Sequence, residues 1–235
     1  MAESYVIGVD FGSDSVRALI VNTETGENVG QGVACYPRWK AGLYQHPEYS
    51  IFRQHPLDYL ESLEKCITTA LAELTEEQKD YVIGIGVDTT GSTPVPVDKN
   101  GIPLALLDEF AENENAMFFL WKDHAAAAEA DEINKLFRNN SENDYTKYQG
   151  DYSAEWYWAK ILYAVRHDEA IRQAAYTWEE HCDWMTGILC GETRPEKIYH
   201  SACAAGHKAL WNSEWNGLPA ASVLEQLDPY LVQVR

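Results

Sequence analysis

The chain has 235 residues, of which 46% are hydrophobic, and its 37 acidic and 18 basic residues give a formal net charge of −19. This composition is typical of a folded protein with a real core, and the length predicts one large domain or two small ones. The strong acidity argues against DNA or RNA as a partner, because nucleic-acid affinity comes from clustered Lys and Arg that neutralise phosphates.

The sequence gives no sign of a membrane or secreted protein. No apolar run approaches the roughly 18 residues of a membrane span, and the start, MAESYVIGVD, lacks the layout of a secretory signal. We therefore expect a cytoplasmic protein without a membrane partner. The five cysteines are odd in number and scattered, which favours reduced core thiols over a disulfide framework.

The first ninety residues are predicted to form strands around one helix. Apolar β-branched runs predict an antiparallel meander with strands at residues 5–9, 16–22 and 28–36. Apolar residues then recur every three or four positions over residues 55–74, which marks one face of a helix. Residues 81–87 read as another short buried strand, ending in Asp88.

The remaining sequence is predicted to be mostly helical. TPVPVD and the turn KNGIP extend the preceding strand as a hairpin. Pro94 and Pro96 suit an edge or an outward-facing ladder position, because proline cannot donate a hydrogen bond. Helical patterns follow at residues 118–137, 153–171 and 179–191, with Ser153 and Gly191 as cap residues. The simplest interpretation is one compact α/β unit with a mixed five-stranded sheet and flanking helices.

The string GVDFGSDSVRALIVN places an acid at the end of a buried strand, followed by glycine and hydroxyls. A carboxylate at the position of Asp10 can hold Mg²⁺ through water. Gly12 allows close approach of backbone, and Ser13 and Ser15 can contact phosphate oxygens. The pattern is not a Walker loop, which lies between a strand and a helix and carries Gly-Lys-Ser/Thr. An ordinary Asp-Gly hairpin remains the alternative.

A second string, GIGVDTTGSTPVPVD, has the same build, with Asp88 after a buried run and Gly91 after two threonines. Two such acid-terminated strands could face one cleft. The alternative is a turn rich in Ser and Thr that binds no ligand.

These strings, with LDEFAENENAMFFLWKDHAA, EWYWAKILYAVRHD and CAAGHKALWN, resemble the N-terminal domain of the FGGY carbohydrate kinase family over essentially the whole chain. The resemblance implies a ribonuclease H-like, actin-like ATPase fold. It also implies transfer of the ATP γ-phosphate, with Mg²⁺, to the terminal hydroxyl of L-ribulose or a related pentulose in L-arabinose catabolism. The alternatives are another pentulose or polyol kinase, such as a xylulokinase-like enzyme, or a non-catalytic actin-like scaffold.

The resemblance also implies a second domain after Arg235, which carries the adenine pocket and the catalytic aspartate. We therefore assign no catalytic residue within residues 1–235 and expect the chain alone to be inactive. Asp10, Gly12, Ser13 and Ser15 would face the phosphates and Mg²⁺, with Asp10 holding the ion through water. The face that meets the second domain is expected to promote self-association, giving a homodimer.

By the same resemblance, the sugar half-site consists of Gly91, Ser92, Trp121, Asp123, Glu155 and Lys208. Gly91 and Ser92 stand where relatives carry bulky polar side chains, so Gly91 could widen the range of pentulose stereoisomers; an ordinary turn glycine is the alternative. Trp121 would pack beside the sugar, or else in the core. Asp123 would accept hydrogen bonds from sugar hydroxyls.

The last two sugar-site residues are charged. Glu155 falls where relatives place a sugar-contacting side chain, and Lys208 would face the hydroxyls and offset charge near the transferred phosphoryl group. His181, Cys182, His200, Cys203 and His207 could be drawn as a metal site, but their spacings match no zinc pattern, so no directly bound metal is expected.

Overall fold

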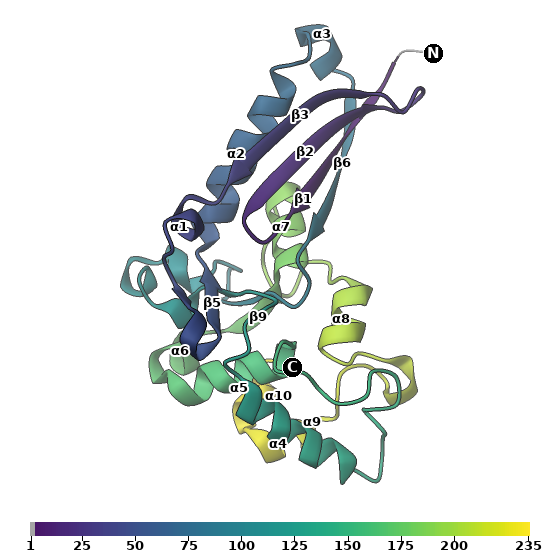
Figure 1. Ribbon diagram of the computed structural model, residues 1–235. Helices are drawn as coiled ribbons and strands as arrows, with labels where there is room; N and C mark the ends of the chain where they lie inside the picture. The colour runs from purple at the N-terminus through teal and green to yellow at the C-terminus, as the bar shows by residue number, and fades with distance from the viewer. Residues whose placement is uncertain (1–2) are drawn as a thin grey trace. The chain divides into compact units, whose positions relative to one another are not determined.

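The computed structural model describes residues 3–235 and divides into two compact units that are interleaved along the chain (Figure 1). The first unit comprises the residues up to Leu43 and His55–Thr90, and the second comprises Tyr44–Gln54 and Gly91–Arg235. The sequence predicted one compact unit; the structure separates two because the helical second half builds a core of its own.

The first unit is a four-stranded sheet in the order β3-β2-β1-β6 with one long helix on it (Figure 1). Its elements are β1 (Tyr5–Phe11), β2 (Ser15–Asn22), β3 (Asn28–Cys35), α1 (Pro37–Lys40), α2 (Pro56–Leu71), α3 (Glu76–Lys79) and β6 (Val82–Thr89). The predicted meander is confirmed, and β6 runs parallel to β1. The sheet is mixed, as expected, but the predicted number of five strands is wrong, because the segment expected to extend β6 pairs elsewhere.

Helix α2 lies close against β3 because the strand has a glycine, Gly32, at the point of contact. A Cβ built on Gly32 would lie 2.1 Å from the carbonyl oxygen of Cys66. The Cys66 thiol in turn donates to the Gly32 carbonyl at 3.2 Å. The absence of a side chain at Gly32 therefore sets the distance between this helix and the sheet.

We predict that Gly32→Ala destabilises the chain by about 3 kcal/mol, because the new methyl group would force the helix backbone away from the strand. Urea unfolding measures the effect. Gly8→Ala is the matched control in the same sheet, since a Cβ there would meet nothing within 4 Å. Equal unfolding midpoints for the two variants would contradict the proposed contact.

Part of this sheet is not covered by α2. Large apolar side chains on β2, β3 and β6 are between 41% and 69% exposed; they are Leu19, Val33, Ile83 and Ile85. The register places Leu19 and Val33 on the face away from α2, whereas Ile83 and Ile85 are on the α2 face at the edge strand β6. Exposed apolar side chains of this size are typical of contact sites.

The second unit combines two small sheets with helices. Its strands are β4 (Gln45–His46), β5 (Ile51–Gln54), β7 (Pro94–Val97), β8 (Phe118–Phe119) and β9 (Thr177–Glu180). Its α-helices are α4 (Ala127–Arg138), α5 (Tyr157–His167), α6 (Glu169–Ala174), α7 (His181–Cys190), α8 (Ala202–Lys208), α9 (Ala221–Leu227) and α10 (Pro229–Gln233). Short 3₁₀ turns lie at Pro47–Tyr49, Leu104–Leu106, Asp108–Phe110, Glu114–Ala116 and Ser213–Trp215.

Helix α5 is at the centre of the core of this unit, and Trp158, Ile161 and Leu162 are fully buried. The predicted helix is therefore confirmed, but Ser153 is not its cap. The helix begins at Tyr157, and the Ser153 hydroxyl instead accepts a hydrogen bond from the Glu155 amide in the turn before it. Gly191 ends α7 with φ 71°, as predicted.

Strand β7 pairs antiparallel with β9, not with β6 as the sequence predicted. In this two-stranded sheet, the edge of β7 away from β9 has a β-bridge from Val97 to Pro103 but no second strand, which tolerates Pro94 and Pro96. Pro94 is paired with Glu180 and Val95 with Glu179, so the register fixes two acidic side chains beside the start of β7.

All five cysteines are free, as predicted, but only Cys66 is buried, and Cys35, Cys190 and Cys203 are exposed. The prediction of core thiols is therefore right for one residue and wrong for those three. Among residues 3–235, no helix is long and apolar enough to cross a membrane.

Candidate functional site

In the first unit, the phosphate-facing residues predicted from sequence lie at the turn between β1 and β2. The Gly12 amide donates to the Ser15 carbonyl at 2.9 Å, which closes the turn. Ser15 is buried, and its hydroxyl donates to Asp14 at 3.1 Å, whereas Ser13 is partly exposed.

Asp10 and Asp88 occupy paired positions on the parallel strands β1 and β6. Both are exposed, and Asp10 forms an ion pair with Arg17 at 3.2 Å. Two carboxylates on neighbouring strands can bind a hydrated Mg²⁺, which keeps most of its water ligands. The two acid-terminated strands are therefore neighbours in one sheet, and whether they face one cleft stays a prediction.

In the second unit, four of the six predicted sugar-site residues come together. Ser92 is buried at the turn before β7, with φ 65°, and its hydroxyl donates to the Glu155 carbonyl oxygen. A Cβ built on Gly91 would lie 3.7 Å from Cε of Lys208, so the lysine side chain lies beside the glycine. The Lys208 ammonium lies 5.8 Å from the centre of the Trp156 ring.

The Glu155 carboxylate has a partner that the sequence did not indicate. Nε2 of His124 lies 2.8 Å from Oε1 of Glu155, and both side chains are partly exposed. His124 is next to Asp123 in the string WKDH, and this adjacency was the only signal that could have pointed to it. The pair presents an imidazole and a carboxylate side by side, both groups that can hydrogen-bond to polyol hydroxyls.

Lys160 is a second residue that the sequence did not reveal, because it lies in the apolar pattern of α5. Its side chain is fully buried, and Nζ donates to the carbonyl oxygens of Ser92 at 2.6 Å, Leu120 at 2.9 Å and Phe119 at 3.4 Å. Burial holds the pKa of Lys160 well below its usual range. Lys160 therefore ties the Ser92 turn to the segment that leads into Trp121.

Glu180, at the end of β9, supports the same turn. Its Oε2 accepts the Thr93 amide at 2.9 Å, and burial raises the pKa of this carboxyl to about 7. Lys160 and Glu180 attract one another electrostatically, which partly opposes the effect of burial on each. Lys160 and Glu180 therefore fix the backbone that carries Gly91 and Ser92 through hydrogen bonds to the Ser92 carbonyl and the Thr93 amide.

Asp123 is fully buried, and protein donors surround its carboxylate. Oδ2 forms an ion pair with Arg53 and accepts the Phe52 amide at 2.7 Å, while Oδ1 accepts the Ala125 amide at 3.2 Å. The Arg53 guanidinium is also buried and lies 3.5 Å above the centre of the Phe119 ring. The structure thus places Asp123 on these protein partners and away from solvent.

Trp121 has a different environment from Asp123. It is 41% exposed, so it is not a core residue, which was the alternative that the sequence left open. An exposed indole at this position offers an apolar face to a ligand.

Comparisons with known proteins match this chain throughout. A model of the FGGY family of carbohydrate kinases, N-terminal domain, matches residues 5–212. The chain is 50% identical to a ribulokinase of Vibrio parahaemolyticus over 99% of this chain and 41% of that protein. It is 35% identical to a ribulokinase of Shouchella clausii over 98% of this chain and 41% of that protein. It therefore spans about two fifths of the length of these relatives.

Solved structures share the fold at low sequence identity. The xylulose kinase from Bifidobacterium adolescentis superposes with a TM-score of 0.72 at 18% identity, over 99% of this chain and 46% of that one. The Plasmodium falciparum glycerol kinase with ADP gives 0.70 at 13% identity, over 99% and 42%. These likenesses confirm the predicted actin-like ATPase architecture.

Proposed function

Because the chain belongs to the FGGY family of carbohydrate kinases, we propose that it supplies the sugar-binding part of an ATP-dependent kinase for L-ribulose. The observation that carries the proposal is the convergence of Gly91, Ser92, Glu155 and Lys208 in the second unit, with His124 on Glu155. Another pentulose or polyol kinase is the alternative within the family.

In this proposal, the sugar hydroxyls are read by side chains of both charges. Lys208 donates to them, the Glu155 carboxylate accepts from them, and Trp121 packs against the carbon face of the sugar. Asp123 acts by holding the Trp121 segment through Arg53, with its oxygens already engaged by protein donors. Gly91 would leave room for pentulose stereoisomers because any larger residue would place its side chain against Lys208, whose Cε is already 3.7 Å from the position of a Cβ.

The phosphate side of the reaction is assigned to the first unit. Asp10 would hold Mg²⁺ through water, and the exposed Asp88 beside it fits a hydrated divalent cation. The backbone at Gly12 and Ser13 would contact phosphate oxygens, while Ser15 would support the turn from its buried position. Bound Mg²⁺ would neutralise charge on ATP during phosphoryl transfer.

No residue of this chain is proposed as the catalytic base. Phosphoryl transfer needs a hydroxyl held in line and water kept away from the γ-phosphate, which takes a closed cleft. We therefore propose that the base and the adenine pocket belong to a further domain of a longer protein. Residues 1–235 alone would bind sugar weakly and turn over negligibly.

The exposed apolar side chains of the first unit support a contact with that further domain or with a second copy of this chain. Leu19 and Val33 present one such surface on the face away from α2, and Ile83 and Ile85 present another at the β6 edge. We propose self-association to a homodimer where the further domain is absent, and a cytoplasmic location, as expected from the sequence.

We predict that L-ribulose raises the thermal unfolding temperature of the chain, because a ligand that binds only the folded state stabilises it. In Gly91→Gln, the L-ribulose concentration needed for half of the maximal protection should rise by at least about tenfold, since the new side chain would fill the space beside Lys208. Gly86→Gln in the first unit is the matched control, because a Cβ there meets nothing within 4 Å.

The result also separates the kinase from an actin-like scaffold. Protection by ATP without any effect of L-ribulose would favour the scaffold and contradict the proposal. Equal protection by L-ribulose and other ketopentoses would favour a broader pentulose kinase, and retained protection in Gly91→Gln would remove that glycine from the site.

A further inference from the structure

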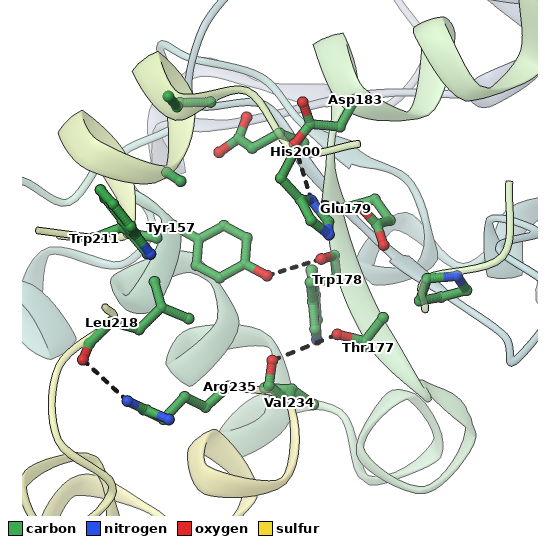
Figure 2. A pocket seen from close by; sticks show the side chains of 16 residues that line it. Tyr157, Thr177, Trp178, Glu179, Asp183, His200, Trp211, Leu218, Val234 and Arg235 are labelled. Carbon is green, nitrogen blue, oxygen red and sulfur yellow. Dashed lines mark hydrogen bonds and ion pairs between the residues drawn. The ribbon is translucent and has the colours of Figure 1, made fainter. Parts of the chain in front are cut away.

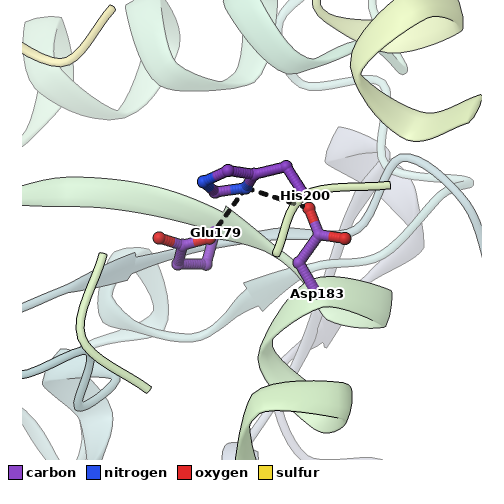
Figure 3. Close-up of side chains that lie close together, drawn as sticks. All are labelled: Glu179, Asp183 and His200. Atoms are coloured by element: carbon purple, nitrogen blue, oxygen red, sulfur yellow. Dashed lines mark hydrogen bonds and ion pairs between the residues drawn. The ribbon is translucent and has the colours of Figure 1, made fainter. Parts of the chain in front are cut away.

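Three side chains from separate elements of the second unit converge at the end of β9. Glu179 lies on β9, Asp183 on the first turn of α7, and His200 just before α8 (Figure 3). Nδ1 of His200 lies 3.2 Å from Oδ2 of Asp183 and 3.6 Å from Oε2 of Glu179. All three potential ligand atoms lie within 4.8 Å of one another.

The Glu179 carboxylate is buried without a full set of partners. Its side chain is 1% exposed, and Oε2 has no hydrogen-bond partner among the described residues, although it points toward the His200 ring (Figure 3). A buried carboxylate oxygen left in this way is costly unless a cation or a donor satisfies it. This orphaned oxygen is the observation that points to a ligand.

A backbone amide fixes the orientation of the Asp183 carboxylate. Its Oδ1 accepts the Ser201 amide at 2.8 Å, which leaves Oδ2 directed at His200. The His200 side chain is 51% exposed, so solutes reach the cluster from solvent. The cluster also borders a cavity of about 480 Å³, lined partly by Tyr157, Trp211 and the three residues themselves, with room for water ligands (Figure 2).

We propose that Glu179, Asp183 and His200 bind a divalent transition-metal ion of the Zn²⁺ class. Two ligands at about 2.1 Å from a tetrahedral Zn²⁺ lie about 3.4 Å apart, and the two distances from His200 Nδ1 are close to that value. One imidazole and two carboxylates suit Zn²⁺, Co²⁺ or Mn²⁺, with water from the cavity as a further ligand. Imidazole is a poor ligand for the hard cation Mg²⁺.

The donor set differs from the Cys and His residues considered in the sequence, of which only His200 takes part. Its signal was the spacing of Glu179 and Asp183, four residues apart where a strand passes into a helix. Binding would join β9 and α7 to the residue preceding α8, the helix that ends at Lys208. The site is independent of the proposed sugar kinase activity.

A competing arrangement needs no metal. Asp183 raises the pKa of His200, so a protonated imidazole could bridge the two acids, while burial raises the pKa of Glu179 to about 8. A metal ion would replace the proton on Nδ1, and both arrangements satisfy the same oxygens. Direct metal binding decides between them.

The test uses the chain stripped with EDTA and titrated with ZnCl₂ at pH 7.5 by calorimetry, with thermal unfolding alongside. We expect one equivalent of Zn²⁺ to bind and raise the unfolding temperature, and Mg²⁺ at the same concentration not to compete with it. His200→Ala should weaken Zn²⁺ binding by at least about tenfold, since it removes a ligand outright. Co²⁺ should give a visible absorption band that this variant loses.

His167→Ala is the matched control, because His167 is an exposed histidine at the end of α5, outside the cluster. It should bind Zn²⁺ as the parent does. Glu179→Gln should weaken binding while leaving the chain folded, because it keeps the size of the side chain and removes the carboxylate that would bind the metal. Absence of Zn²⁺ binding, or equal loss in the His167 and His200 variants, would overturn the proposal.

Discussion

Replacing Asp123 with Ala is expected to lower the free energy of unfolding by about 3–5 kcal/mol. The substitution would leave the Arg53 guanidinium buried without its counter-ion, and the Phe52 and Ala125 amides without an acceptor. Urea unfolding followed by tryptophan fluorescence measures the loss. The effect should exceed that of removing any exposed ion pair, which contributes at most about 1 kcal/mol.

The double variant Arg53→Met with Asp123→Leu is the control. Removing both charges leaves no unpaired ion, so it should recover much of the stability lost in the single variant. If Asp123 instead serves mainly to bind sugar hydroxyls, Asp123→Ala would unfold like the parent and lose only the protection by L-ribulose. That result would contradict the role assigned to its contact with Arg53.

Lys160→Met is expected to cost about 3 kcal/mol and to remove the protection by L-ribulose as well. The variant removes the Lys160 donor from the buried carbonyl oxygen of Ser92 and from that of Leu120, which keeps only its bond from the Asp123 amide. It also removes the electrostatic attraction between Lys160 and Glu180. Lys160 is fully buried, so the loss of sugar binding would result from a change in the conformation of the Ser92 turn. Urea unfolding and sugar titration of the same sample measure both quantities.

Lys135→Met provides the comparison, because Lys135 is an exposed lysine on α4 and should change stability by less than about 0.5 kcal/mol. A positioning role also predicts a conformational signature. Amide exchange at Thr93 should accelerate in Lys160→Met even under conditions where the variant stays folded. Unchanged exchange together with unchanged sugar affinity would exclude this role.

The elements that the sequence predicts well are those specified by neighbours in the chain. The meander of β1 to β3 follows from alternating apolar runs and short turns, and α2 follows from its 3.6-residue pattern. Gly191 ends α7 because the cap needs a left-handed backbone, a local requirement that glycine meets.

The features that the sequence did not predict depend on contacts between distant residues. Pro94 pairs with Glu180, and Arg53 meets Asp123 across 70 positions, so no local pattern could place them. Lys160 sits in an apolar helical face, where a lysine would ordinarily be read as extending to solvent. Its hydrogen-bond partners are backbone carbonyl groups, which every residue has, so no residue type in the sequence points to them.

The interleaving of the two units constrains the order in which the chain can fold during synthesis. The first unit is complete once Thr90 has emerged, but it then carries residues 44–54, which have no partners within it. β5 must wait for β8, and Arg53 must wait for Asp123. The ribosome must add some thirty more residues before these partners exist, which takes a few seconds at about 5–20 residues per second. During that time, residues 44–54 of the growing chain are open to proteolysis and to binding by other molecules.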